Sequence, residues 1–315
     1  MKLRIGSRGS QLALWQANHI AGLLRGQGHE VEIEIIKTTG DRLQEVTFAE
    51  VGSKGMFTKE IEEALAAGRV DLAVHSLKDL PTDLPEPFAL AATPQRVDPR
   101  DAFVSVKYGG LAELPRGARV GTSSQRRRAQ LRSLRPDIEA VEFRGNVDTR
   151  LRKLAEGQVD GILLAAAGLE RLNKTEWVRE RMDPKDFCPA AGQGALGIET
   201  RRDDAATIAA VRFLDDAETR FAVTVERAAL AALGGGCQVP IGIYCRPSPE
   251  RSVEGASWVE IFAVVADPKT GKAARVFDLA PRSESEPTAL GLVMAEKLLQ
   301  AGAGPLLSAV DEGSR

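Results

Sequence analysis

The segments RIGSRGSQ, residues 4–11, and RVGTSSQR, residues 119–126, begin two similar stretches of the chain. In both, an arginine and a branched aliphatic residue lead into glycine and a turn rich in hydroxyl side chains. Further along, LAAGRVDLAV at 65–74 resembles LAEGQVDGIL at 154–163. Matches this short also arise by chance between strand–helix–strand units, but their common order favours a diverged duplication.

Each stretch predicts a strand followed by a helix, and in the first copy Ser10 is suited to cap that helix. A second strand follows, VEIEIIK at 31–37 or IEAVEFR at 138–144, with alternating apolar residues and a cation at its end. The two copies therefore predict the same local order of elements.

The next helix is expected to stop at Gly68 in one copy and at Gly157 in the other. The apolar segments VDLAVHS at 70–76 and VDGILLA at 159–165 then predict buried strands. Strand, helix, strand, helix, strand implies two α/β lobes. Facing lobes place the carboxyl ends of their strands, and the cations there, on both walls of one cleft, which suits a small anion.

From about residue 219 the pattern changes. A helix at 218–233 is followed by a glycine loop and by strands at 239–245, 258–267 and 273–280, of which the last two are joined by the turn DPKTG. With a closing helix at 287–302, this predicts a third domain of the α+β class.

The composition is that of a globular protein with more than one domain. The chain has 315 residues, of which 43% are hydrophobic and 27% charged, and a formal net charge of −2. This charge argues against a surface built throughout for nucleic acid or anionic lipid. Charged residues interrupt the N-terminal segment before the apolar part of a signal peptide forms, and no apolar run spans a bilayer, so we expect a cytoplasmic protein.

Cysteines and histidines are few. Cys188, Cys237 and Cys245 are the only cysteines, and no cysteine or histidine has a close partner at metal-ligand spacing. Cys237 follows three glycines in GGGC, where a metal ligand, half of a disulfide and a thiol for covalent chemistry are the alternatives. A reducing compartment disfavours the disulfide, and the spacing disfavours a metal. Cys188 and Cys245 are expected to be buried.

Cations are concentrated in GTSSQRRRAQLRSLRP at 121–136 and FRGNVDTRLRK at 143–153. A run of arginines is usually a solvated helix face. Here hydroxyl residues open the helix, so its free N–H groups and the arginines could bind carboxylate or phosphate together. In the first lobe, Lys78 and Asp79 follow a buried strand, where a structural and a catalytic role stay equally open.

The glycines in GQGALG at 192–197 have dinucleotide-motif spacing, but the residues before them do not predict a strand. We therefore reject a nucleotide site there.

The motifs resemble those of one family. IGSRGSQLALWQ, VGSKGMFTKE, DLAVHSLKDLP, DPRDAFVS, VGTSSQRRRAQL, FRGNVDTRL, AAAGLERL, PAAGQGALGIE and GGGCQVPIG occur in the order typical of hydroxymethylbilane synthases, also called porphobilinogen deaminases. The resemblance covers nearly the whole chain. It implies a transferase of tetrapyrrole synthesis that joins four porphobilinogen molecules head to tail, loses ammonia from each and hydrolytically releases linear hydroxymethylbilane.

The resemblance also implies the architecture. The fold class is α/β, with two similar doubly wound lobes like those of type II periplasmic binding proteins and a C-terminal α+β domain with a small antiparallel sheet. Domain one is expected to cover residues 1–95 and 195–213, domain two residues 100–190, and domain three residues 217–315. A monomer is expected.

The resemblance implies a dipyrromethane cofactor joined to Cys237 by a thioether, with Asp79 as the catalytic residue and no metal. The residues it assigns to the cofactor are Ser76, Lys78, Thr122, Ser123, Ser124, Arg126, Arg127, Arg144 and Gly145. Those it assigns to the substrate are Arg8, Lys54, Lys59, Arg150, Arg171 and Gln193. Because every pyrrole ring brings two carboxylates, a growing chain needs many cations in one cleft.

The alternative is a non-catalytic two-lobed binding protein for a small polycarboxylate. Such a protein needs neither the GGGC loop nor Asp79, and a secreted example needs a signal peptide. A nucleic-acid binder is weaker still, since aromatic residues make up only 5% of the chain.

The thioether predicts that active protein is heavier than its polypeptide by the mass of a two-ring primer. Intact-mass spectrometry of active protein checks this, and an unmodified mass would refute the primer hypothesis.

Overall fold

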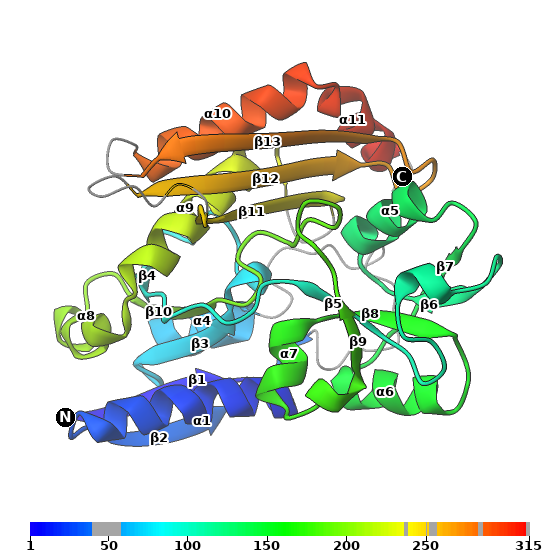
Figure 1. Cartoon of the computed structure of the whole chain (residues 1–315). Coiled ribbons are helices and arrows are strands. Elements are labelled where there is room, and N and C mark those ends of the chain that lie inside the picture. The colour runs from blue at the N-terminus through cyan, green and yellow to red at the C-terminus, as the bar shows by residue number, and fades with distance from the viewer. Residues whose placement is uncertain (40–57, 236–238, 250, 252–256, 283–285, 313–315) are drawn as a thin grey trace.

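The computed structural model describes residues 1–39, 58–235, 239–249, 251, 257–282 and 286–312. They form three sheets with their helices. In Figure 1 the first lobe lies at the lower left, the second at the lower right, and the third domain across the top. Among the helices described, none is both long enough and apolar enough to cross a membrane.

The first lobe is built on a five-stranded sheet in the order β2-β1-β3-β10-β4. Its strands are β1 (Lys2–Ser7), β2 (Glu30–Ile35), β3 (Leu72–Ser76), β4 (Phe88–Ala92) and β10 (Leu196–Arg201). Helices α1 (Gln11–Gly26) and α8 (Ala205–Val211) share one apolar core with the sheet, and α4 (Lys59–Ala66) packs in another. Ser10 caps α1 as expected, because its hydroxyl accepts a hydrogen bond from the backbone N–H of Ala13.

The second lobe has a five-stranded sheet in the order β7-β6-β8-β5-β9. Its strands are β5 (Asp101–Val104), β6 (Arg119–Gly121), β7 (Glu139–Val141), β8 (Gly161–Ala165) and β9 (Val178–Arg181). Its helices are α5 (Gln125–Leu134), α6 (Val147–Ala155) and α7 (Ala166–Arg171). Gly68 and Gly157 follow α4 and α6 with φ of 66° and 77°, the left-handed conformation expected at these helix ends.

The two sheets have the same topology, and each contains one strand that the chain forms after it arrives from the other lobe. In each sheet three neighbouring strands are parallel, and the fourth runs antiparallel to both of its neighbours: β10 in the first lobe and β5 in the second. Each of these strands directly follows a passage of the chain from the other lobe. We call these passages the crossovers, residues 93–100 and 182–195. The duplicated α/β fold is confirmed, and the crossovers link the lobes covalently twice.

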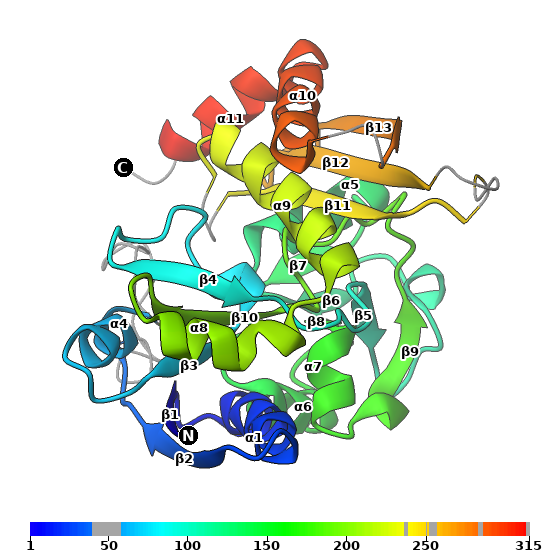
Figure 2. The same cartoon turned by 90° about the vertical axis from the view of Figure 1, so that its left-hand side faces the viewer.

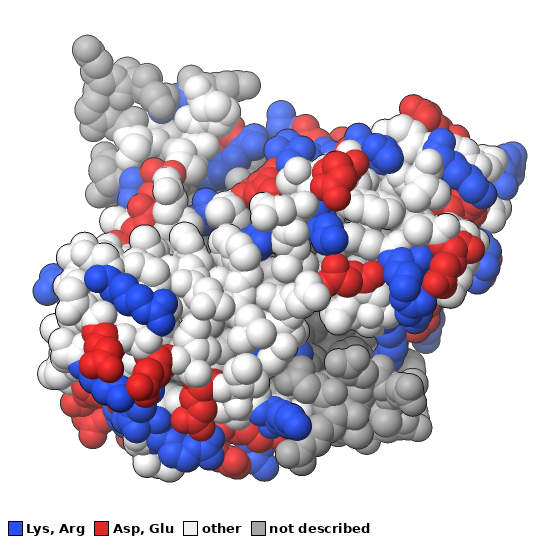
Figure 3. Space-filling view, turned by 90° about the horizontal axis from the view of Figure 1, so that it is seen from below, with Lys and Arg blue, Asp and Glu red and all other residues white. Residues whose placement is uncertain are grey.

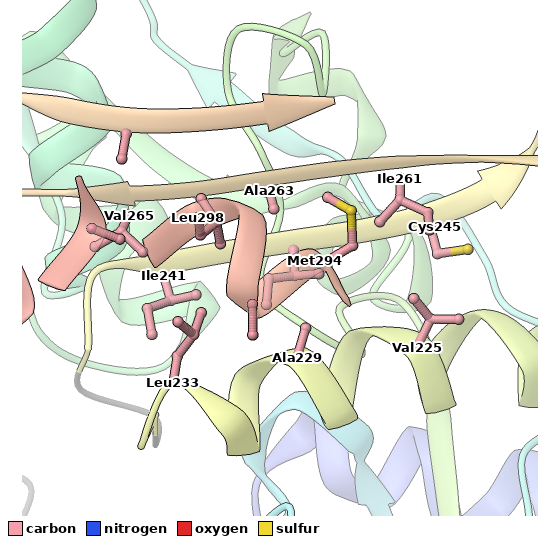
Figure 4. Close-up of a cluster of buried hydrophobic side chains, with 14 of the residues drawn as sticks. Val225, Ala229, Leu233, Ile241, Cys245, Ile261, Ala263, Val265, Met294 and Leu298 are labelled. Atoms are coloured by element: carbon pink, nitrogen blue, oxygen red, sulfur yellow. The ribbon is translucent and has the colours of Figure 1, made fainter. Parts of the chain in front are cut away.

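The third domain has the antiparallel sheet β11-β12-β13. Its strands are β11 (Ile241–Pro247), β12 (Trp258–Ala266) and β13 (Ala273–Pro281), and its helices are α9 (Ala217–Ala232), α10 (Pro287–Gln300) and α11 (Ala303–Glu312). Figure 4 shows Ala229 of α9 and Met294 of α10 packed beneath Ile261 and Ala263 of β12. Figure 2 shows α9 running from this core toward the first lobe. The expected α+β domain is confirmed, although α11 was not predicted.

Cys188 and Cys245 are buried with free thiols, as the sequence predicts. Cys245 belongs to the core of the third domain, and Cys188 packs between the second lobe and that domain. Burial raises the pKa of both thiols well above the ordinary value, so neither is a reactive thiolate.

The glycines of GQGALG serve the crossover rather than a nucleotide. Gly192 and Gly194 have φ of 72° and 88°, and Gly197 lies in β10. A Cβ on Gly194 would lie 2.6 Å from the carbonyl oxygen of Val97 in the other crossover. Both crossovers therefore approach each other through a backbone contact that no side chain permits.

Gly194→Ala should destabilise the protein by more than Gly28→Ala does. Gly28 also has a positive φ, of 81°, but a Cβ there meets no atom within 4 Å. Conformational strain alone costs about 1 kcal/mol, and the backbone clash at Gly194 should add about 1–3 kcal/mol. Urea unfolding of the two variants separates these contributions, and equal losses would contradict the contact.

Candidate functional site

The first wall of the site lies at the end of β3. A small cavity of about 80 Å³ is lined by residues that include Arg8, Ser76 and Asp79. The hydroxyl of Ser76 accepts a hydrogen bond from Nε2 of the buried Gln16 at 2.8 Å, so α1 fixes the end of the strand. Asp79 ends a short 3-10 turn, Leu77–Asp79, and is exposed. The structure thus brings three expected site residues together.

The second wall begins with hydroxyl residues before α5. The hydroxyl of Ser124 caps the helix by accepting from the backbone N–H of Arg127 at 3.4 Å. Thr122 Oγ1 accepts from the N–H of Ser124, and Ser123 Oγ donates to the carbonyl of Phe143 at 2.8 Å. These contacts hold the turn, and the first turn of the helix retains N–H groups that α-helical hydrogen bonding leaves unused. Such a terminus favours an anion.

Arg126 and Arg127 are not a solvated helix face, since only 4% and 6% of their surfaces are exposed. Both pair with Asp101, the first residue of β5: Arg126 Nη1 lies 2.6 Å from Oδ2, and Arg127 Nη2 lies 2.7 Å from Oδ1. Nε2 of Gln193 also donates to Asp101 Oδ1 at 3.0 Å. Burial alone would raise the pKa of Asp101, but the arginine charges and hydrogen bonds lower it well below its usual range.

Lys78 and Gln193 connect the two walls. Lys78 Nζ donates to Gln193 Oε1 at 3.5 Å, and Arg127 Nη2 donates to the same oxygen at 3.5 Å. Burial lowers the pKa of Lys78 to about 8; the charge of Asp79 opposes this shift and that of Arg127 adds to it. The first-lobe lysine therefore lies within electrostatic reach of the second-lobe arginines, and an anion between them would favour its charged form.

Arg144 and Arg150 extend the cationic wall. Arg144 Nε donates to Glu142 at 2.7 Å. Burial lowers the pKa of Arg150 to about 10, and the charges of Arg127 and Arg144 act in the same direction. Gly145 lies beside Arg144 with φ of 118°, and a Cβ there would collide with Thr149 at 2.7 Å. Glycine is thus required for the tight turn into α6.

Arg171 lies between the lobes. It is 7% exposed, its Nη2 donates to the carbonyl of Gly194 at 2.7 Å, and its guanidinium lies 6.0 Å from the ring centre of Trp15 in α1. Burial lowers its pKa to about 10. Arg171 therefore contacts the first lobe and a crossover.

Three other expected residues are less informative. Lys59 is the exposed first residue of α4. Lys54 and Cys237 lie outside the described residues.

The buried donors fit a group rich in carboxylates. Nε of Arg126, Arg150 and Arg171 is buried without a hydrogen-bond partner among the described residues. Buried N–H groups without acceptors are costly, and carboxylate oxygens are the acceptors that arginine prefers. This donor set suits the acetate and propionate groups of a dipyrromethane.

Sequence reasoning did not assign a role to Asp101 or Gln16. The segment DPRDAFVS predicts a buried strand that begins with a carboxylate, and such a carboxylate requires a charged partner. That partner could not be named, because Arg126 is 25 residues away along the chain. Gln16 on the buried face of α1 likewise requires a hydrogen-bond partner, but it is a weaker indication because it is uncharged.

The fold and the site define a two-lobed α/β protein with a cluster of buried cations where its lobes meet. The description "Porphobilinogen deaminase, dipyromethane cofactor binding domain" matches residues 3–209, and "Porphobilinogen deaminase, C-terminal domain" matches residues 220–300. The chain belongs to the porphobilinogen deaminase family.

Relatives match over nearly the full length. The chain is 49% identical to the porphobilinogen deaminase of Trichlorobacter lovleyi over 98% of this chain and 96% of the relative. It is 48% identical to that of Nitratidesulfovibrio vulgaris over 98% and 97%. Among solved structures, the methionine-binding protein MetQ has 14% identity and a TM-score of 0.44, with coverage of 68% of this chain and 89% of MetQ.

Asp101→Asn should lower the free energy of unfolding by about 3–5 kcal/mol at pH 7, because two buried arginines lose their anionic partner. In the unfolded chain the pKa of this carboxyl is about 3.9, and in the folded protein it is lower. Ionised Asp101 therefore contributes fully to stability above about pH 3.9, and this stabilisation is lost as the pH falls below that value. Urea unfolding between pH 3 and pH 7 should therefore show a steeper acid loss for the original protein than for the variant.

Asp137→Asn is the matched control. Asp137 also pairs with an arginine, Arg135 at 2.8 Å, but both side chains are partly exposed, at 23% and 22%. We expect a much smaller loss. Equal losses for the two variants would contradict the central role of Asp101.

Proposed function

We propose that this protein performs the reaction of its family as a hydroxymethylbilane synthase. It would deaminate porphobilinogen, join four units head to tail, and release linear hydroxymethylbilane by hydrolysis. The observation that carries the proposal is a cluster of cations around Asp101 and Lys78, beside the exposed carboxylate of Asp79. Because the reaction transfers a group, we propose that the enzyme is a transferase. We also propose that it acts in the cytoplasm as a monomer.

Cys237 is the proposed attachment point of the dipyrromethane cofactor. When bound, this group supplies the terminal pyrrole to which substrate units are added. A soft thiol can form a thioether with an electrophilic methylene carbon without a metal. The residues proposed to hold the cofactor are those of the cationic wall and its neighbours: Ser76, Lys78, Thr122, Ser123, Ser124, Arg126, Arg127, Arg144 and Gly145.

Arginines supply the carboxylate recognition proposed for the site. Arg126 and Arg127 share one internal anion, Asp101, so the pair carries an excess positive charge. Arg150 adds another cation within reach of Arg127. Pyrrole side-chain carboxylates would balance this charge, and the planar guanidinium groups can bind them in a two-pronged geometry.

We propose that the incoming substrate is held by Arg8, Lys54, Lys59, Arg150, Arg171 and Gln193. Arg8 lines the same cavity as Asp79, and Arg171 and Gln193 lie at the crossover. Their placement supports a substrate position between the lobes, next to Asp79.

Asp79 is the proposed catalytic residue. A cationic cleft opposes the formation of the positive charge that develops when ammonia leaves the substrate. A carboxylate at about 4 Å offsets roughly 4 kcal/mol of this cost at an effective dielectric constant near 20. Its oxygens can also accept hydrogen bonds from pyrrole N–H groups and orient the rings.

A non-catalytic binding protein for a small polycarboxylate is the other candidate. Its support is likeness of fold alone, and a fold does not imply a function.

Asp79→Asn and Asp79→Ala should each lower kcat by roughly 10²-fold or more, with a smaller change in KM, because the charge at position 79 acts mainly in the transition state. Hydroxymethylbilane formation from porphobilinogen measures the effect. Asp83→Asn, which removes an exposed carboxylate four residues later, is the control and should retain normal turnover. Normal turnover by Asp79→Ala would refute the assignment, and no product from the original protein would refute the proposed function.

A further inference from the structure

A buried histidine–glutamate pair lies behind the first wall. Nε2 of His75 in β3 is 2.9 Å from Oε2 of Glu199 in β10. The two side chains are 7% and 0% exposed. The strands are neighbours in the sheet, with His75 opposite Gly197. A buried polar pair of this kind is costly unless both groups are satisfied, so its position beside the site calls for a functional explanation.

His75 faces the site on its other side. It lines the cavity that also contains Arg8, Ser76 and Asp79. Its second ring nitrogen, Nδ1, has no hydrogen-bond partner among the described residues. Glu199 thus holds the ring by one nitrogen, and the other makes no hydrogen bond with the described residues. This is the arrangement in which a carboxylate orients an imidazole for proton transfer.

A second carboxyl group completes the cluster. Burial raises the pKa of Glu62 in α4, and the charge of Glu199 adds to the increase. Oε1 of Glu199 is buried without a partner among the described residues. The ionisable groups near His75 are Glu199 from β10 and Glu62 from α4, and Arg8 after β1 and Asp79 after β3 line the same cavity.

We propose that His75, oriented by Glu199, is the proton-transfer residue of this cavity and works beside Asp79. The inference rests on the proposed function. A carboxylate that must stay ionised to stabilise a developing cation is poorly suited to retaining a proton at the same time. An imidazole, which titrates near pH 6.5 when unperturbed, can accept and release one at neutral pH.

The proton balance of coupling defines the step. A C–N bond breaks in the substrate ammonium form, and ammonia leaves with the electron pair. Coupling would then join the resulting methylene to the free α-carbon of the acceptor pyrrole by a C–C bond. The C–H bond at that carbon would break and leave its electrons to the ring, and Nδ1 of neutral His75 would accept the proton. The imidazolium, paired with Glu199, finally returns the proton through solvent to ammonia, which departs as ammonium.

Kinetics of the full-length protein carrying its primer test the step. His75→Asn should lower kcat by roughly 10²-fold with little change in KM, and should remove the rise of kcat with pH that requires the neutral ring. Glu199→Gln should move this rise toward lower pH, because the protonated ring loses its ionic partner. His29→Asn, outside the site, should match the original protein. A purely structural pair would change stability but leave the pH profile unchanged, which would overturn the proposal.

Imidazole nitrogen NMR provides a readout that does not depend on activity. The chain has only three histidines, so the His75 signals can be assigned by their loss in His75→Asn. Followed from pH 5 to pH 9, they should change with pH in the original protein, and the midpoint of this change should lie at lower pH in Glu199→Gln. If His75→Asn does not fold, selective spectra of Glu199→Gln and His29→Asn assign the signals instead. Signals that do not move over this range would refute the proposal, even if the protein makes no hydroxymethylbilane and the proposed function itself fails.

Discussion

The carboxylate of Asp101 is the interaction on which the site depends. It has no exposed surface, and it accepts from Arg126 and Arg127 of α5 and from Gln193 of the second crossover. Asp101 itself begins β5, immediately after the first crossover. One buried anion therefore ties α5 to both passages between the lobes. Because the ion pairs are removed from water, losing the anion would leave two buried cations without compensation.

The same interaction determines the electrostatics of the cleft. One carboxylate cannot neutralise two arginines, and the charge of Arg127 adds to the lowering of pKa that burial causes at both Lys78 and Arg150. The excess charge is concentrated inside, whereas the face in Figure 3 carries cations and anions side by side. A slightly acidic protein can thus enclose a strongly cationic site. In the proposed function, ligand carboxylates supply the missing negative charge.

The duplication explains why the two walls are built on the same arrangement of strands, although their side chains differ in chemistry. Both lobes end their third strand next to the cleft, β3 at Ser76 and β8 at Ala165. In the first lobe that end leads into Lys78 and Asp79 and is supported by the His75–Glu199 pair. In the second lobe β8 leads into α7, and β6, the counterpart of β1, leads into the hydroxyl turn and α5. One wall is therefore suited to proton transfer and charge stabilisation, and the other to carboxylate binding.

Local patterns determined the elements of this protein, and tertiary structure decided how the side chains are paired. Strand alternation, the Ser10 cap and the glycines after α4 and α6 act over a few residues, so they could be recognised in the sequence, as could the duplication and the α+β domain. The family motifs also predicted most candidate site residues. The partners of Asp101 and His75 could not be derived, because Arg126 is 25 and Glu199 is 124 residues away. Such contacts depend on how strands are ordered and exchanged between sheets, which no local periodicity specifies.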